Sequence, residues 1–177
     1  MSSIIDELLN PIRVPPMIRV RQKFATKRIT DVSGEVRRQV SGGSLLSRVK
    51  PGQTVAITAG SRGLADLPSI IREVVALLKS VGAIPFIVPA MGSHGGATAE
   101  GQIAMLAGMG ITEETVCAPI RATMETVQVG VTKGGLPAYI DKYASEADAI
   151  VVINRIKPHV AFTGPYESGL MKMITIG

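Results

Sequence analysis

Three glycine-rich stretches of the sequence carry side chains that could do acid–base or nucleophilic chemistry. They are residues 60–63 (Gly-Ser-Arg-Gly), residues 92–96 (Gly-Ser-His-Gly-Gly) and residues 154–172, which begin Asn-Arg-Ile-Lys-Pro-His. His94 and His159 are the only two histidines in the chain, and the second and third stretches contain one each. An imidazole ring takes up and releases protons near neutral pH, so both rings are candidates for general acid–base catalysis.

The two histidines fit together as a pair. Each follows a short apolar run, at residues 84–90 and 148–154, that is typical of a strand in a parallel sheet. Right-handed crossovers bring the loops that follow such strands to one edge of the sheet. Two imidazoles there can face each other across a small substrate, one removing a proton and the other returning it to the opposite face. The pair therefore predicts inversion of a stereocentre.

The first stretch predicts contacts to an anion. Glycines let backbone N–H groups approach a ligand closely, and a following helix adds its dipole. Arg62 offers a planar fork for a carboxylate or a phosphate, although a surface turn with a solvated arginine would have the same sequence. The glycine spacing matches neither a P-loop nor a dinucleotide-binding fingerprint.

Lys172 and Cys117 are the remaining candidate nucleophiles. Lys172 is either a nucleophile or cofactor anchor, or an ordinary solvent-exposed lysine. Cys117 lies between Val116 and Ala118, which favours a small buried side chain over a nucleophile. Because it is the only cysteine, the chain has no internal disulfide and no multi-cysteine metal site.

Alternating strands and helices are expected to position these loops. The apolar periodicity and the Gly and Pro signals predict an α/β fold with a mostly parallel sheet and flanking helices. Pro85 and Pro89 place the second apolar strand near the margin of that sheet. The expected strands are Met17–Phe24 (half-buried), Thr54–Ala59, Ile84–Ala90, Val127–Thr132 and Asp148–Asn154, and the expected helices are Asp31–Val40, Asp66–Val81, Thr98–Ala107, a short one after Thr112, and Pro137–Glu146.

Composition narrows the class of protein. The chain has 177 residues, 46% of them hydrophobic and 19% charged, which is too apolar for a disordered protein. No apolar run reaches the roughly 18–20 residues of a membrane span, and residues 1–10 lack the basic start of a secretory signal. With one cysteine, these features predict a cytoplasmic protein. The final residues are apolar, so we expect the polypeptide to continue beyond Gly177.

The net charge of +5 comes with a concentration of basic residues in the N-terminal part of the chain. Nucleic acid is one reading of this charge, and it would show as a strong salt dependence of oligonucleotide affinity. Aromatic residues make up only 3% and Trp is absent, which favours a solvated or subunit-facing basic surface instead. We therefore expect no nucleic-acid partner and no membrane partner. A homo-oligomer is compatible with this charge pattern.

With these loops laid out, the chain resembles the nickel-dependent lactate racemase family, specifically its N-terminal domain. The resemblance spans roughly Val55 to Lys172. It rests on a strand ending in Ser61-Arg62, on the loop of residues 90–94 (Ala-Met-Gly-Ser-His) with Thr98 opening the next helix, and on Lys-Pro-His159 ahead of Lys172. It implies a Rossmann-like domain of a two-domain enzyme, with the active site between the domains and the second domain outside this chain.

The resemblance also implies a cofactor and a reaction. The family uses a nickel-pincer nucleotide, a pyridinium mononucleotide derivative tethered to a lysine. One histidine deprotonates the substrate hydroxyl while the α-hydride passes to the cofactor, and the hydride returns to the other face with a second histidine assisting. By resemblance the substrate is a small 2-hydroxy acid, His94 and His159 are the pair, and Arg62 holds the carboxylate. The implied cofactor contacts are Lys172 as the tether, with Gly60, Ser61, Gly92, Ser93 and Thr98.

Two departures mark a divergent member. Ala59 stands where the family commonly has Asp, and Lys172 lies further from His159 than the family's lysine usually does. No histidine follows His159, so a nickel-ligating histidine is not expected in this chain. The first hypothesis is a racemase or epimerase of a 2-hydroxy acid. The alternative is a non-catalytic module that binds an anion or nucleotide and has lost the cofactor tether.

Overall fold

A computed structural model describes residues 4, 9, 11, 15–24 and 28–177. Its centre is a three-stranded parallel sheet of order β2-β1-β5, made by β1 (Thr54–Ala59), β2 (Ile84–Pro89) and β5 (Ala149–Val151). The α/β class and the parallel sheet are therefore confirmed. β2 lies at the edge of the sheet, as its two prolines predict.

The two faces of the sheet hold separate apolar clusters because successive strand residues point to opposite sides. Val55, Ile57 and Ile87 belong to the larger cluster, which α3 (Leu67–Ser80), α4 (Ala99–Gly108) and α5 (Glu113–Val116) complete. Ala56 and Phe86 face the other way, toward the short helix α6 (Lys142–Ser145). Both faces of β1 and β2 are covered, which explains why these two strands are almost continuously apolar.

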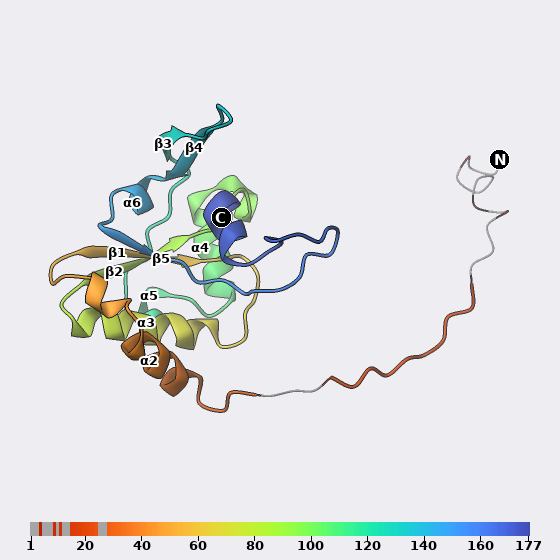
Figure 1. Cartoon of the computed structure of the whole chain (residues 1–177), viewed down its shortest axis with the longest axis horizontal. Coiled ribbons are helices and arrows are strands. Elements are labelled where there is room, and N and C mark those ends of the chain that lie inside the picture. The colour runs from red at the N-terminus through yellow and green to blue at the C-terminus, as the bar shows by residue number, and fades with distance from the viewer. Residues whose placement is uncertain (1–3, 5–8, 10, 12–14, 25–27) are drawn as a thin grey trace.

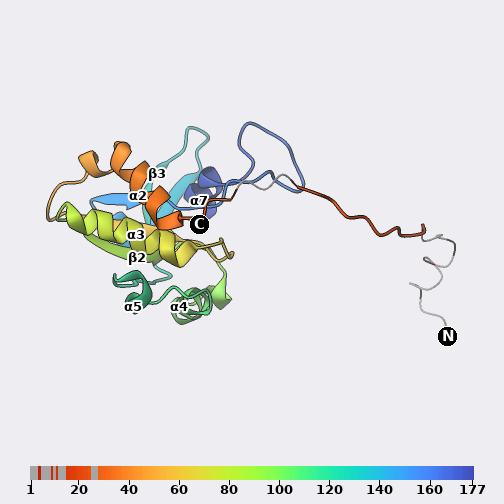
Figure 2. The same cartoon turned by 90° about the horizontal axis from the view of Figure 1, so that it is seen from below.

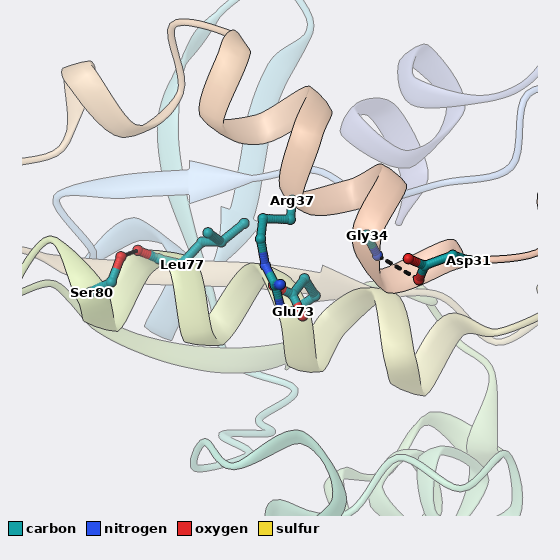
Figure 3. A network of polar contacts seen from close by, with 6 residues as sticks. All are labelled: Asp31, Gly34, Arg37, Glu73, Leu77 and Ser80. Atoms are coloured by element: carbon teal, nitrogen blue, oxygen red, sulfur yellow. Dashed lines mark hydrogen bonds and ion pairs between the residues drawn. The ribbon is translucent and has the colours of Figure 1, made fainter.

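Helix α2 (Val32–Gly42) packs along α3 on the outside of the sheet (Figures 1 and 2). Figure 3 shows the polar contacts there: Arg37 Nε donates to Glu73 Oε1 at 2.8 Å, and the Asp31 carboxylate accepts from Gly34 N at 2.8 Å. Asp31 is thus a side-chain cap of α2. Asp66 lies at the same position before α3 but makes no side-chain cap, and its φ of 60° is left-handed.

The predicted helix at 137–146 is wrong over its first half. Residues Pro137–Asp141 form β4, which pairs antiparallel with β3 (Thr126–Val131), and only α6 is helical. The turn between the strands contains Gly135 with a φ of 82°, which reverses the chain and supplies β4 with a partner. The hairpin stands away from the central sheet (Figure 1).

The predicted strand Met17–Phe24 is also wrong. These residues are not paired with any strand in the described part of the chain, and Met17 is 94% exposed. The alternation of apolar and charged residues shows which side chains would share a face of a strand. A strand also needs a neighbouring strand to pair with, and alternation does not provide one. Cys117 is exposed rather than buried, because it caps α5 in a left-handed conformation (φ 57°) while Val116 and Ala118 take the buried positions.

The last strand is shorter than expected. β5 ends at Val151 rather than Asn154, since the Ile153 N–H donates to the Thr58 side-chain hydroxyl at 3.0 Å instead of to a backbone carbonyl of β1. Asp148 fixes the start of the pairing by accepting from the backbone and side chain of Thr54. These bonds lower the pKa of Asp148 below its ordinary value. Among the described residues, no helix is long and apolar enough to cross a membrane.

Candidate active site

A cavity of about 570 Å³ lies at the carboxyl ends of the three parallel strands. Its walls come from the loops after β1, β2 and β5 and from helix α7 (Leu170–Ile176). Right-handed connections in a parallel sheet bring these loops to one edge, as the sequence predicts. The predicted site residues that line it are Gly60, Ser61, Arg62, His94, His159 and Lys172.

The loops after β1 and β2 meet through a serine and a histidine. Ser61 Oγ lies 2.5 Å from His94 Nδ1, so the two chemistry-bearing loops are joined by a direct hydrogen bond. Gly60 is closely approached by α7, since a Cβ there would lie 3.0 Å from the Met173 side chain. The sequence suggested Ser61 as a cofactor contact, whereas the structure gives it a partner in His94.

A buried glutamine forms hydrogen bonds with the backbone of the loop that contains His94. Gln102, only 3% exposed, donates from Nε2 to the carbonyl of Gly92 at 2.8 Å and to that of His94 at 3.4 Å. Sequence analysis missed Gln102. Its position four residues before the buried Leu106, on the same side of α4, was the available signal.

Three predicted cofactor contacts do not line this cavity. Gly92 lies in the left-handed region (φ 57°), and its carbonyl is taken by Gln102. Ser93 is exposed, and its carbonyl accepts from Ala97 N. Thr98 caps α4 by accepting from Gly101 N at 3.1 Å, as predicted for a helix start. In this structure these residues shape the loop that carries His94, and their contact with a cofactor stays a prediction.

The loop after β5 is folded around His159. The His159 ring stacks on Phe162, with ring centroids 4.0 Å apart. The Glu167 carboxylate accepts from the backbone N–H of His159 at 2.8 Å and from that of Gly164 at 3.0 Å. These two bonds hold the pKa of Glu167 below its ordinary value. Asn154 closes the loop by donating from Nδ2 to the Gly169 carbonyl at 2.7 Å.

The described lining of the cavity is cationic. Arg62, Arg155, Lys157 and Lys172 line it, and no Asp or Glu is found among the described residues that do so. Such an enclosure favours an anion by direct attraction and by the planar donors of arginine. Sequence analysis assigned roles to Arg62 and Lys172 but not to Arg155 and Lys157, because their proximity depends on where the loop after β5 folds.

The cavity fits the organic part of the implied cofactor. Four cations and two serines, Ser61 and Ser168, suit a phosphate-bearing group, and the amine of Lys172 stands at the wall. The described residues give less support for binding of the nickel ion. Within the described ranges, no group of three or more His, Cys, Asp or Glu side chains could hold a metal ion. A nickel ligand set would have to come from the cofactor or from other residues.

Comparison with known proteins shows the family of this chain. No curated protein matches the chain. A family model described as the lactate racemase N-terminal domain matches residues 4–177, which is nearly the whole chain and includes all three loops of the cavity. The chain therefore belongs to the family of lactate racemase N-terminal domains.

Proposed function

We propose that this domain contributes to the active site of an isomerase, a racemase or epimerase that inverts the hydroxyl-bearing carbon of a small 2-hydroxy acid. The observation that carries the proposal is the cavity, where two histidines from different sheet loops stand with Arg62 and Lys172. Inversion of this carbon by hydride transfer needs an acid–base pair for the hydroxyl proton, a group that binds the carboxylate and a hydride acceptor, and the cavity offers residues for the first two.

Each residue of the cavity has a chemical task in this proposal. Arg62 binds the substrate carboxylate through paired N–H donors. One histidine takes the proton of the substrate hydroxyl and returns it to the product, while the other donates to the same oxygen from the opposite side. The apolar side chains of Leu64 and Ile153 restrict water at the inner wall.

The cofactor implied by the family would be held by the chain's own cations. When bound, a nickel-pincer nucleotide supplies reversible hydride acceptance from the α-carbon. Lys172 is the residue that would carry it covalently, and Arg155 and Lys157 are the candidates to bind its phosphate.

The experiment is enantiomer interconversion by the complete protein loaded with cofactor. We expect His94→Ala and His159→Ala each to lower kcat by about 10²–10⁴-fold, the usual contribution of a general acid or base. Chiral chromatography of a 2-hydroxy acid panel measures the rate. Lys133→Ala, in the exposed hairpin turn away from the cavity, is the control and should keep the wild-type rate. Wild-type rates in both histidine variants would disprove the assignment.

A second candidate function is a module that binds an anion or nucleotide without turnover. Ala59 supports it, because the position where the family commonly has Asp is filled here by a fully buried methyl group. Intact mass spectrometry of protein made with the cofactor pathway separates the two. A covalent adduct that disappears in Lys172→Ala favours the enzyme, whereas reversible nucleotide binding with no adduct and no isomerisation favours the module.

A further inference from the structure

The two histidines of the cavity have different hydrogen-bond partners at Nδ1. His159 Nδ1 accepts from the backbone N–H of Ala161 at 3.1 Å. A backbone N–H only donates, so this nitrogen must be unprotonated, and the neutral ring carries its proton on Nε2. His94 Nδ1 instead meets the hydroxyl of Ser61, which can donate or accept. His94 can therefore adopt either neutral tautomer, whereas His159 is restricted to one.

Glu167 determines the backbone turn that makes this restriction. Its two carboxylate oxygens accept separately from the N–H groups of His159 and Gly164, and so bracket the segment that contains Ala161. Bonds from N–H groups to a carboxylate are charge-assisted and stronger than neutral ones. The stacking of Phe162, inside the same segment, fixes the plane of the His159 ring.

The same turn fixes which ring nitrogen remains available. Because Nδ1 is occupied by Ala161, only Nε2 is left for a molecule in the cavity that His159 lines. A proton on Nδ1 would point at the N–H of Ala161, and two donors facing each other cannot form a hydrogen bond. A neutral imidazole with Nε2–H acts as a hydrogen-bond donor to a substrate oxygen, while the ring partnered by a hydroxyl can take up a proton.

We propose that Glu167 is a positioning residue for His159: by fixing the turn it keeps Nδ1 as the acceptor of the Ala161 N–H, so that His159 donates from Nε2 to the substrate oxygen and His94 takes the proton. This assignment rests on the proposed function and makes the two histidines unequal within it. Glu167 does not line the cavity of about 570 Å³, although it lines a smaller neighbouring cavity together with His159 and Lys172. Its carboxylate bonds go to two backbone N–H groups of the turn, and so it acts on the reaction through the position of His159.

The kinetic test uses Glu167→Gln in the complete, cofactor-loaded protein. Glutamine keeps one acceptor oxygen and turns an N–H₂ group toward a backbone donor, so the turn loses one of its two bonds. We expect kcat to fall on the order of 10²-fold, as for a misplaced catalytic group, with KM nearly unchanged because Arg62 is untouched. Glu167→Asp, which keeps both oxygens and the charge, should recover part of the rate. Glu100→Gln, exposed on α4, is the matched control.

A double-mutant cycle separates positioning from general stabilisation. If Glu167 acts through His159, Glu167→Gln adds no further loss of kcat in a His159→Ala background. An undiminished loss there, or an unchanged kcat in Glu167→Gln alone, would overturn the proposal.

Nitrogen NMR of the ¹⁵N-histidine-labelled chain tests the tautomer without any need for activity. Only His94 and His159 report, and His94→Ala assigns them. We expect His159 to show an unprotonated Nδ1 and a protonated Nε2, and Glu167→Gln to mix the tautomers. A protonated Nδ1 in the neutral wild-type ring, or the same spectrum in both proteins, would overturn the positioning role. A correct spectrum with no isomerisation would instead count against the proposed function alone.

Discussion

At the scale of single residues, the site depends on hydrogen bonds that join its loops to one another. Ser61 reaches His94 across 33 positions of sequence, and Glu167 reaches back to the His159 backbone. Both contacts fix an imidazole ring rather than the fold as a whole. Their effects should therefore appear in the rate of the reaction more than in the stability of the protein.

Ser61→Ala removes the hydroxyl partner of His94 Nδ1. A hydrogen bond of this kind contributes about 1–1.5 kcal/mol, so we expect kcat/KM for the 2-hydroxy acid to fall roughly 10-fold. Ser61→Thr restores a hydroxyl and should recover activity. Ser80→Ala is the control: the Ser80 hydroxyl donates to the Leu77 carbonyl on α3 (Figure 3), and neither residue lines the cavity. Equal rates for Ser61→Ala and Ser80→Ala would show that the contact has no catalytic role.

At the scale of elements, the His94 loop is shaped by glycines that pack backbone against backbone. Gly95 and Gly96 both have left-handed φ values, of 67° and 70°. A Cβ on Gly95 would lie 2.6 Å from the backbone of Gly101 in α4, whereas a Cβ on Gly96 would meet nothing within 4 Å. The loop therefore reaches α4 only because Gly95 has no side chain.

This difference gives a matched pair of substitutions. Gly96→Ala should cost about 1–2 kcal/mol of unfolding free energy, the price of a left-handed alanine. Gly95→Ala should cost more, because the backbone of α4 must also move. Denaturant unfolding followed by circular dichroism measures both. Equal costs would mean that the close approach of the loop to α4 is not needed for the fold.

At the scale of the whole molecule, the net charge of +5 is distributed so that four cations line one cavity. The larger apolar cluster lies between the sheet and helices α3, α4 and α5, whereas the cavity lies at the carboxyl ends of the strands. The four cations of the cavity are thus separate from the apolar contacts that stabilise the fold. An anion should bind without rearrangement of the core, and salt should weaken that binding by screening.

Inorganic phosphate is a simple probe of this charge. We expect phosphate to raise the Tm of the protein by mass action, and added NaCl to reduce that shift. The double substitution Arg155→Gln with Lys157→Gln should remove most of the shift, because both cations line the cavity. Lys133→Gln, on the exposed hairpin turn, changes the net charge without touching the cavity and should preserve the shift. The same loss in both proteins would mean that phosphate responds to overall charge only.

The sequence alone was enough to predict those elements whose signals lie entirely within their own residues. Thr54–Ala59 forms a strand with the bounds that its apolar run predicts, and Thr98 starts α4 because its own side chain caps it. The loops that follow the parallel strands, with Arg62, His94 and His159, were predicted to meet because parallel topology brings such loops to one edge of the sheet.

Only the tertiary structure decided which elements and contacts form when they need a partner from another part of the chain. Pro137–Asp141 is a strand because β3 pairs with it, and Met17–Phe24 is not a strand because no described segment does. Gln102 and Glu167 were missed although their partners are only ten and eight residues away in the sequence, because each bonds to a backbone group whose direction depends on how the loop folds. A single sequence records which side chains can bond, whereas the choice of partner depends on how the folded chain brings remote segments together.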